Sequence, residues 1–203
     1  MIEVSDGRVP YVAAWSGERR LAARVVRSPC GNGIGYWDET LVDRDTKGVL
    51  WARVESRPGA GRPLFGEVHS LRQRRVMKRL LCQVCAGLPD RGPDGVLWVM
   101  PDFRGDWPRW PDGMATYDAP VCMPCARTAA RLCPGLRGGL VHVRSRSHPI
   151  VGVRGVRYRP TPTGPVAIGN AVVAHDDPAI RWTVAHQLVR QLNQCRVVEP
   201  ITR

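Results

Sequence analysis

The sequence predicts an α+β fold built around a module that four cysteines hold together. Cysteine pairs occur at Cys82-Gln83-Val84-Cys85 and at Cys122-Met123-Pro124-Cys125, with 36 residues between them. The chain has 203 residues, of which 21 are Gly and 18 are Pro. Such a composition favours short antiparallel strands and many turns over a helical bundle. An apolar fraction of 43% is enough to form a buried core.

Residues 1–66 are expected to form a β-rich N-terminal segment. Short apolar stretches at 9–14, 21–26 and 49–54 are strand candidates, and Gly- and Pro-rich stretches separate them. Cys30 lies in a Gly-rich stretch that matches no nucleotide-binding pattern, and we expect a tight turn there.

Residues 67–137 are expected to form the cysteine module, led by an Arg-rich helix. Residues 66–81 contain no Pro or Gly after Gly66, and their apolar residues form a rough helical stripe. The apolar run 96–100 predicts a buried strand, and the Trp107–Trp110 region an ordered loop. Pro124 suits the first turn of a second helix, which the sequence Cys133-Pro134-Gly135 ends.

Residues 138–203 are expected to form strands followed by a C-terminal helix. The strand candidates are 140–143, 150–158 and 166–174. The sequence Asp176-Asp177-Pro178 is typical of a helix start. An amphipathic helix to about residue 195 then follows from the fourfold spacing of Ile180, Val184, Leu188 and Leu192. The three segments are also compatible with one compact unit.

The two cysteine pairs predict one structural zinc site with Cys82, Cys85, Cys122 and Cys125 as ligands. Each pair supplies two thiolates at the spacing of half a tetrahedral site. No apolar run reaches the ~20 residues that span a bilayer, and the acidic N-terminus is unlike a signal peptide. We therefore expect a cytoplasmic protein without membrane contact. Thiols stay reduced in the cytoplasm, so such cysteine pairs are expected to bind metal and not to form disulfides.

The order of basic helix, cysteine knuckle, strand pair and cysteine pair at a helix start resembles a treble-clef zinc finger. Together with the Arg-rich lead-in, it resembles the zinc-supported form of the HNH endonuclease family over roughly residues 67–134. That family places a catalytic His between or just after the cysteine pairs, whereas residues 83–141 contain none. The resemblance therefore implies a structural zinc, held by the four cysteines, and no HNH chemistry. The chain also resembles zinc-containing proteins of GC-rich bacteria.

The positive charge predicts an anionic partner, with DNA or RNA as the first choice. Lys and Arg number 30 against 18 acidic residues, for a net charge of +12. Two groups are candidates for binding phosphates. The predicted helix supplies Arg72, Arg74, Arg75, Lys78 and Arg79, and the following strands supply Arg144 and Arg146, with Arg154, Arg157 and Arg159 beyond them.

Two alternative functions remain open. An enzyme with a structural zinc, such as a metal-dependent nuclease, is compatible with a site near Asp43, Glu55 or Cys30. A protein-interaction adaptor is compatible with a contact surface at Trp107 and Trp110. We expect Cys133 to pack in the core, and we assign no role to His175 or His186.

Overall fold

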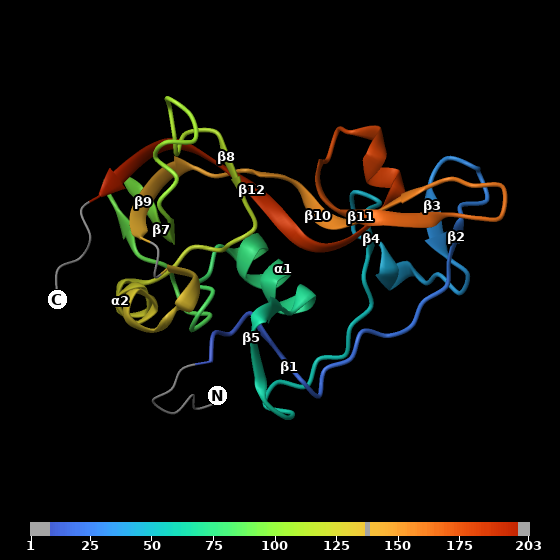
Figure 1. The fold of residues 1–203 in the computed structure, drawn as a ribbon, viewed down its shortest axis with the longest axis horizontal. Helices are drawn as coiled ribbons and strands as arrows, with labels where there is room; N and C mark the ends of the chain where they lie inside the picture. The colour runs from blue at the N-terminus through green and yellow to red at the C-terminus, as the bar shows by residue number, and fades with distance from the viewer. Residues whose placement is uncertain (1–8, 137–138, 199–203) are drawn as a thin grey trace. The chain divides into compact units, whose positions relative to one another are not determined.

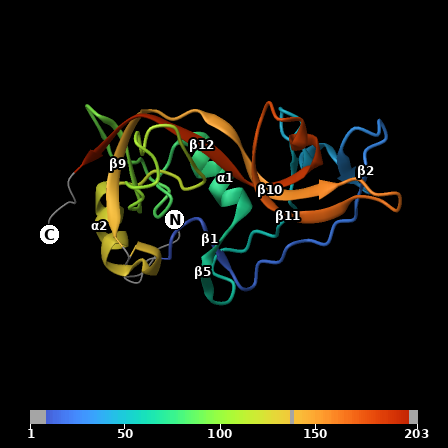
Figure 2. The same ribbon diagram turned by 45° about the horizontal axis from the view of Figure 1, so that its top comes forward.

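The computed structural model describes residues 9–136 and 139–198. Within them it forms an α+β fold of two α-helices and mostly antiparallel strands (Figure 1 and Figure 2). The chain divides into two compact units, and each is discontinuous in sequence. The first unit comprises Met1–Val12, Arg72–Ile150 and Arg190–Arg203, and the second comprises Ala13–Leu71 and Val151–Val189.

The first unit contains the cysteine pairs, most of one helix and all of the other. Helix α1 spans Ser70–Arg79 and α2 spans Met123–Leu132. Strand β9 pairs antiparallel with β7 on one side and with the C-terminal part of β12 on the other, while β8 also pairs with β12. The strands are β6 (Arg91–Gly92), β7 (Gly95–Pro101), β8 (Met114–Thr116), β9 (Leu140–Ser147) and β12 (Thr183–Val198).

Strand β7 separates two apolar clusters, because successive side chains of a strand point to opposite faces. Trp98 packs in a cluster with Val143 and Leu192. Its neighbour Leu97 packs in a second cluster, which includes Ala126 of α2 and two of the cysteines. Both faces of β7 are therefore buried, as the uninterrupted apolar run at 96–100 predicts.

The second unit contains two strand pairs and a small sheet. Strand β1 pairs with β5 and β2 with β3, both antiparallel. The sheet has the order β11-β10-β12, and β4 pairs in parallel with the N-terminal part of β12. The strands are β1 (Ala13–Trp15), β2 (Val25–Arg27), β3 (Ile34–Tyr36), β4 (Leu50–Trp51), β5 (Pro63–Val68), β10 (Ile150–Arg159) and β11 (Val166–Ala174).

The predicted C-terminal helix is wrong. Its start signal is real, since Pro178 opens a 3-10 turn, Pro178–Trp182, and Asp177 accepts a hydrogen bond from the Ala179 N–H. The chain then continues as strand β12. An apolar residue at every fourth position also fits a strand, because side chains an even number of residues apart lie on the same face of a strand. Val184, Leu188 and Leu192 therefore share one face of a strand as readily as one face of a helix.

The other predicted elements are largely confirmed, with shifted ends. The Arg-rich helix begins at Ser70 and not at residue 66, because Val68 belongs to β5 and pairs with Ala13. The second helix is confirmed, and Cys133 is its C-cap. Strands occur near each predicted position in the N-terminal segment and at 96–100, 140–143, 150–158 and 166–174. No helix in the described part of the chain is long and apolar enough to cross a membrane.

Candidate metal centre

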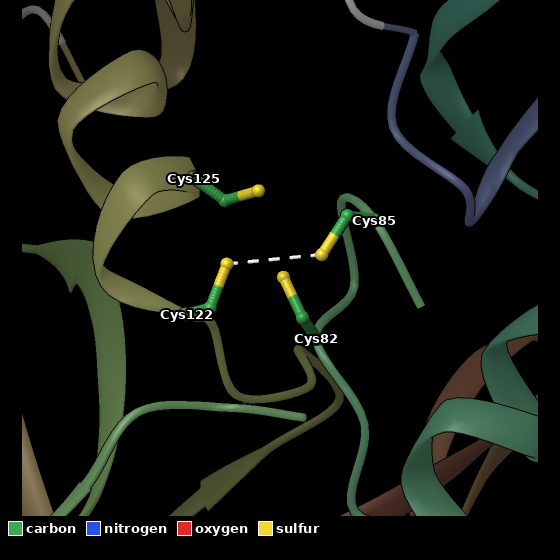
Figure 3. Close-up of side chains that lie close together, drawn as sticks. All are labelled: Cys82, Cys85, Cys122 and Cys125. Atoms are coloured by element: carbon green, nitrogen blue, oxygen red, sulfur yellow. Dashed lines mark hydrogen bonds between the residues drawn. The ribbon is translucent and has the colours of Figure 1, made fainter. Parts of the chain in front are cut away.

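The four predicted ligands lie together in the first unit. The Sγ atoms of Cys82, Cys85, Cys122 and Cys125 are all within 4.8 Å of one another. Figure 3 shows the four side chains converging from two places, the turn that follows α1 and the start of α2. The Sγ atoms of Cys85 and Cys122, one from each pair, are 3.7 Å apart.

The first pair lies on a tight turn that the local sequence permits. Helix α1 ends as Leu80 adopts a positive φ of 52°, and Ala86 adopts a φ of 57° after Cys85. The turn is closed by backbone hydrogen bonds from the Ala86 N–H to the Cys82 carbonyl and from the Cys82 N–H to the Gly87 carbonyl, both 2.8 Å. Small residues at 86 and 87 allow this close approach of the backbone to the thiols.

The second pair lies at the N-terminus of α2. Cys122 is the N-cap residue and Cys125 lies in the first turn, with Pro124 between them. Pro is favoured there because its fixed φ suits a helix and its missing N–H has no helical partner to lose. The Gln83 N–H donates to the Pro120 carbonyl at 3.0 Å, which joins the segments that carry the two pairs.

The thiols differ in exposure. Cys82 and Cys125 are buried, Cys122 is half-buried and Cys85 is exposed. Burial raises the pKa of Cys82 to about 11 and that of Cys125 further. Burial opposes ionisation of Cys85 as well, but the Gly87 N–H and the neighbouring thiols lower its pKa overall. Metal binding at this site therefore has to displace protons from buried thiols.

The donor set fits one metal ion. Four sulfurs around an ion at ~2.3 Å are separated by about 3.8 Å in a tetrahedral arrangement. The Cys85–Cys122 separation of 3.7 Å is close to this value, and all the separations are within 4.8 Å. Among residues 9–136 and 139–198, these cysteines are the only group of three or more His, Cys, Asp or Glu with atoms close enough to share an ion. The four cysteines can thus bind a metal ion, with no position left open by a missing ligand.

The remaining cysteines lie apart from the centre. Cys133 was expected in the core, and this prediction is wrong: it is exposed as the C-cap of α2, where its neighbours Leu132 and Pro134 are exposed as well. Cys30 lies in the predicted turn, where the Gly31 N–H donates to the Ser28 carbonyl at 2.8 Å. The Ser28 hydroxyl, 2.9 Å from the sulfur, is the main cause of a lowered pKa for this exposed thiol.

The basic residues of α1 lie on two different faces. Arg72 is buried with Gln73, Val76 and Met77, so it belongs to the packed side of the helix. Arg74 is half-buried. The exposed residues are Arg75, Lys78 and Arg79, whose spacing of three and four places them on one face.

The two candidate arginines of β9 are bound to acidic residues. Arg144 is half-buried and forms an ion pair with Asp90. Arg146 is exposed and lies 3.1 Å from Asp94, which also pairs with Arg196 at 3.2 Å. These pairs fasten β9 and β12 to the turn before β7 and reduce the charge that either arginine offers to a phosphate.

The acidic residues of the nuclease hypothesis have structural partners in the second unit. Asp43 is buried and accepts two hydrogen bonds of 2.8 Å from Arg53, as well as hydrogen bonds from the Thr40 N–H and hydroxyl. Glu55 lies 3.5 Å from Arg19 and 3.9 Å from Arg57. The structure brings neither carboxylate into a cation site.

The aromatic loop is a packing element. Trp110 is buried in the apolar cluster around Trp98, and Trp107 is half-buried against the same cluster. The indole N–H of Trp107 donates to the Asp112 carbonyl at 3.2 Å. The two indole rings therefore pack largely inside the first unit, while residues 102–106, 108 and 109 of the same loop are exposed.

Two features of the structure have no counterpart among the sequence-based predictions. Arg190 is buried and donates to the carbonyls of Met77 and His148. No local sequence pattern predicts this contact, since Met77 is 113 residues away in the chain.

The second feature is a pair of apolar side chains on the surface. Leu41 and Val42 project into solvent, 99% and 86% exposed. The spacing of Thr40 and Asp43, which together form a capping box, is a signal for that turn.

In comparisons with protein families, curated proteins and solved structures, the chain shows no significant match.

Proposed function

We propose that the chain is a zinc-stabilised nucleic-acid-binding protein that contacts phosphates through the exposed face of α1. The observation that carries the proposal is the cluster of Arg75, Lys78 and Arg79 on this face, directly before the cysteine centre. We define these three residues as the cationic face.

Zinc is the ion that this donor set favours. Four cysteine thiolates form a soft, closed coordination shell, which suits structural zinc and leaves no site for substrate. Zinc held between the turn after α1 and the start of α2 would stabilise the fold of the first unit. This structural role requires no catalytic residues.

The treble-clef resemblance supports the same assignment. A cysteine turn, a following strand and a cysteine pair at a helix start occur in the order of that zinc finger. The HNH-type catalytic base has no equivalent beside the four cysteines, and the next His in the chain, His142, is buried in β9. The proposal is therefore binding without cleavage.

The charge of α1 supports phosphate contact. The helix contains five basic residues and no acidic residue, and its cationic face projects away from the packed side. Helix α2 adds Arg127 and Arg131, both exposed and four residues apart. Within the described part of the chain, no ion pair involves Arg75, Lys78, Arg79, Arg127 or Arg131, in contrast to Arg144 and Arg146.

Phosphate contacts make binding depend steeply on salt, because each neutralised phosphate releases condensed counterions. Replacing the three residues of the cationic face with Gln should weaken binding to DNA and RNA of any sequence. It should also reduce the slope of log K against log salt by about one for each lost contact.

The test compares two triple variants of the full chain. The first is R75Q/K78Q/R79Q, and the matched control is R20Q/R27Q/R62Q, which removes three exposed cations of the second unit. Both lose the same net charge. Fluorescence anisotropy with single- and double-stranded DNA and with RNA, over a series of salt concentrations, should show the loss only in the first variant. Equal losses in both variants, or no salt-dependent binding by the wild type, would refute the proposal.

A further inference from the structure

Strand β11 is the long open edge of the sheet in the second unit. Among the described residues, no strand pairs with its outer side. At the other edge, β4 has two residues, both buried, and Leu50 also forms a β-bridge with Arg44. A short, covered edge resists further pairing, whereas a long open edge is a template for another strand.

The open edge lacks most of the features that protect natural edges. The nine residues of β11 include no charged residue and no Pro. Val166, Ile168 and Val172 are 44%, 50% and 52% exposed. One protective feature is a β-bulge, since the register with β10 skips Ile168. The uninterrupted part of the edge is therefore the stretch 170–174.

The register defines which backbone groups point outward. The His175 N–H donates to the Val151 carbonyl at 2.9 Å, which makes this a hydrogen-bonded pair of the β10–β11 ladder. Such pairs alternate along an antiparallel ladder. The N–H and C=O groups of Asn170, Val172 and Ala174 therefore face away from β10. Consistent with this direction, the Ala174 carbonyl accepts from the Asp177 N–H in the next turn.

We infer that β11 pairs antiparallel with β11 of a second copy of this chain, about a twofold axis at Val172. In this arrangement Val172 exchanges both of its backbone hydrogen bonds with Val172 of the second copy. The Ala174 N–H of each copy donates to the Asn170 carbonyl of the other. The edge is thus complementary to itself, as a twofold interface requires.

The charge distribution permits a second copy at this position. Two chains of net charge +12 repel, and they approach at least cost where the facing strands carry no cations. Arg154, which lies opposite Val172 on β10, directs its guanidinium to the Gln187 side chain at 2.7 Å on the side away from the edge. An uncharged strand with an exposed Val at its centre is such a position.

The dimer should be weak, because a short ladder buries less than the ~1,200 Å² of a typical stable interface. Sedimentation velocity of the full chain, over about 1–200 µM, should show the average mass rising from the 22.5 kDa of a monomer. Higher salt should strengthen the dimer because it screens the repulsion between the copies. Salt should weaken nucleic-acid binding, so the two kinds of association are distinguishable.

Two variants test the edge. V172K places like charges directly opposite each other and should raise the dimer dissociation constant at least about tenfold. V172P removes an outward N–H without removing a donor to β10, and it should act in the same direction. V42K is the matched control, since it adds the same charge at an exposed Val of the same unit.

Thermal melting followed by circular dichroism confirms that each variant is folded. The amide hydrogen of Val172 in the wild type should exchange more slowly as protein concentration rises, which tests the edge without substitution. A wild type that stays monomeric throughout, or a dimer that V172K and V42K weaken equally or not at all, would overturn the inference.

Discussion

The two units stabilise irregular backbone in different ways. In the first unit, four cysteine thiols converge from a turn and from the start of a helix, where they could hold a metal ion supplied from outside the chain. In the second, the turn after β3 is held by the chain's own charges. Arg53 binds Asp43 and Asp38, and its guanidinium lies 4.6 Å from the centre of the Tyr36 ring.

This difference implies that the units respond to different perturbations. Removing metal acts on the first unit, because apposed thiolates repel and buried thiols must take up protons. Acid acts on the Arg53 network of the second unit, because a protonated carboxyl no longer pairs with a guanidinium. Each of the following substitutions removes an interaction that stabilises one of the two units.

The largest effect is expected from the metal ligands. Replacing Cys82 or Cys125 with Ala should abolish tight metal binding and unfold the region around α2, since structural zinc sites contribute about 10–16 kcal/mol of apparent binding free energy. The measurements are metal content by mass spectrometry and hydrogen exchange of the first unit, before and after chelation. The wild type should hold about one ion per chain.

Cys133→Ala is the matched control for this experiment. Cys133 lies on the same helix but is exposed and outside the four-cysteine group. Its replacement should leave metal content and exchange unchanged. If the ligand variants kept their metal, or if chelation altered only the second unit, the assigned role of the centre would be wrong.

An intermediate effect is expected for Arg190 in the first unit. Its guanidinium satisfies the Met77 carbonyl in the last turn of α1, where helix carbonyls lack intrahelical partners. Arg190→Met should lower the free energy of unfolding by about 2–4 kcal/mol, because buried carbonyls lose their donors. Denaturant titration measures this loss, and Arg104→Met, at an exposed arginine paired with Asp102, should show little change.

A somewhat smaller effect, with a distinct pH dependence, is expected for Asp43 in the second unit. Hydrogen bonds from Arg53 hold the pKa of Asp43 well below its usual range. Asp43→Asn should lower the free energy of unfolding by about 2–3 kcal/mol at pH 7, since the buried charge pair is broken.

The depressed pKa determines the sign of this dependence. The unfolded carboxyl ionises near pH 3.9, so the ion pair contributes its full stability above that pH and loses it as the pH falls towards the folded value. The difference in free energy of unfolding between the wild type and Asp43→Asn should therefore be constant from about pH 5 to 8 and shrink below about pH 4. A difference that grew on acidification would contradict the assignment, and urea titrations at several pH values provide the measurement.

Local chemistry allowed several elements to be predicted. The cysteine spacing predicted that the four cysteines come together, the run at 96–100 predicted β7, and Pro124 predicted the start of α2. In each case residues next to one another in the chain carry the signal. The helix expected after Pro178 failed because an apolar residue at every fourth position fits both a helical and an extended backbone.

The arginines also show that a local sequence pattern does not predict the environment of a side chain in the fold. Composition established a cationic chain, but Arg72 is buried, Arg144 is paired and Arg79 is exposed, although all three were equal candidates. Their difference depends on residues such as Asp90, 54 positions from Arg144. A sequence pattern contains no information on such contacts.

The sequence by itself thus determined which four cysteines could share a metal ion, the α+β class and the net charge, because donor type, residue composition and neighbouring spacing are local properties. Only the tertiary structure decided that β12 is a strand, which cations lie on the surface, and that β11 is left as an open edge. Those outcomes depend on burial and on partners distant in the chain, and the free energy of such contacts exceeds the local preferences of the residues that make them.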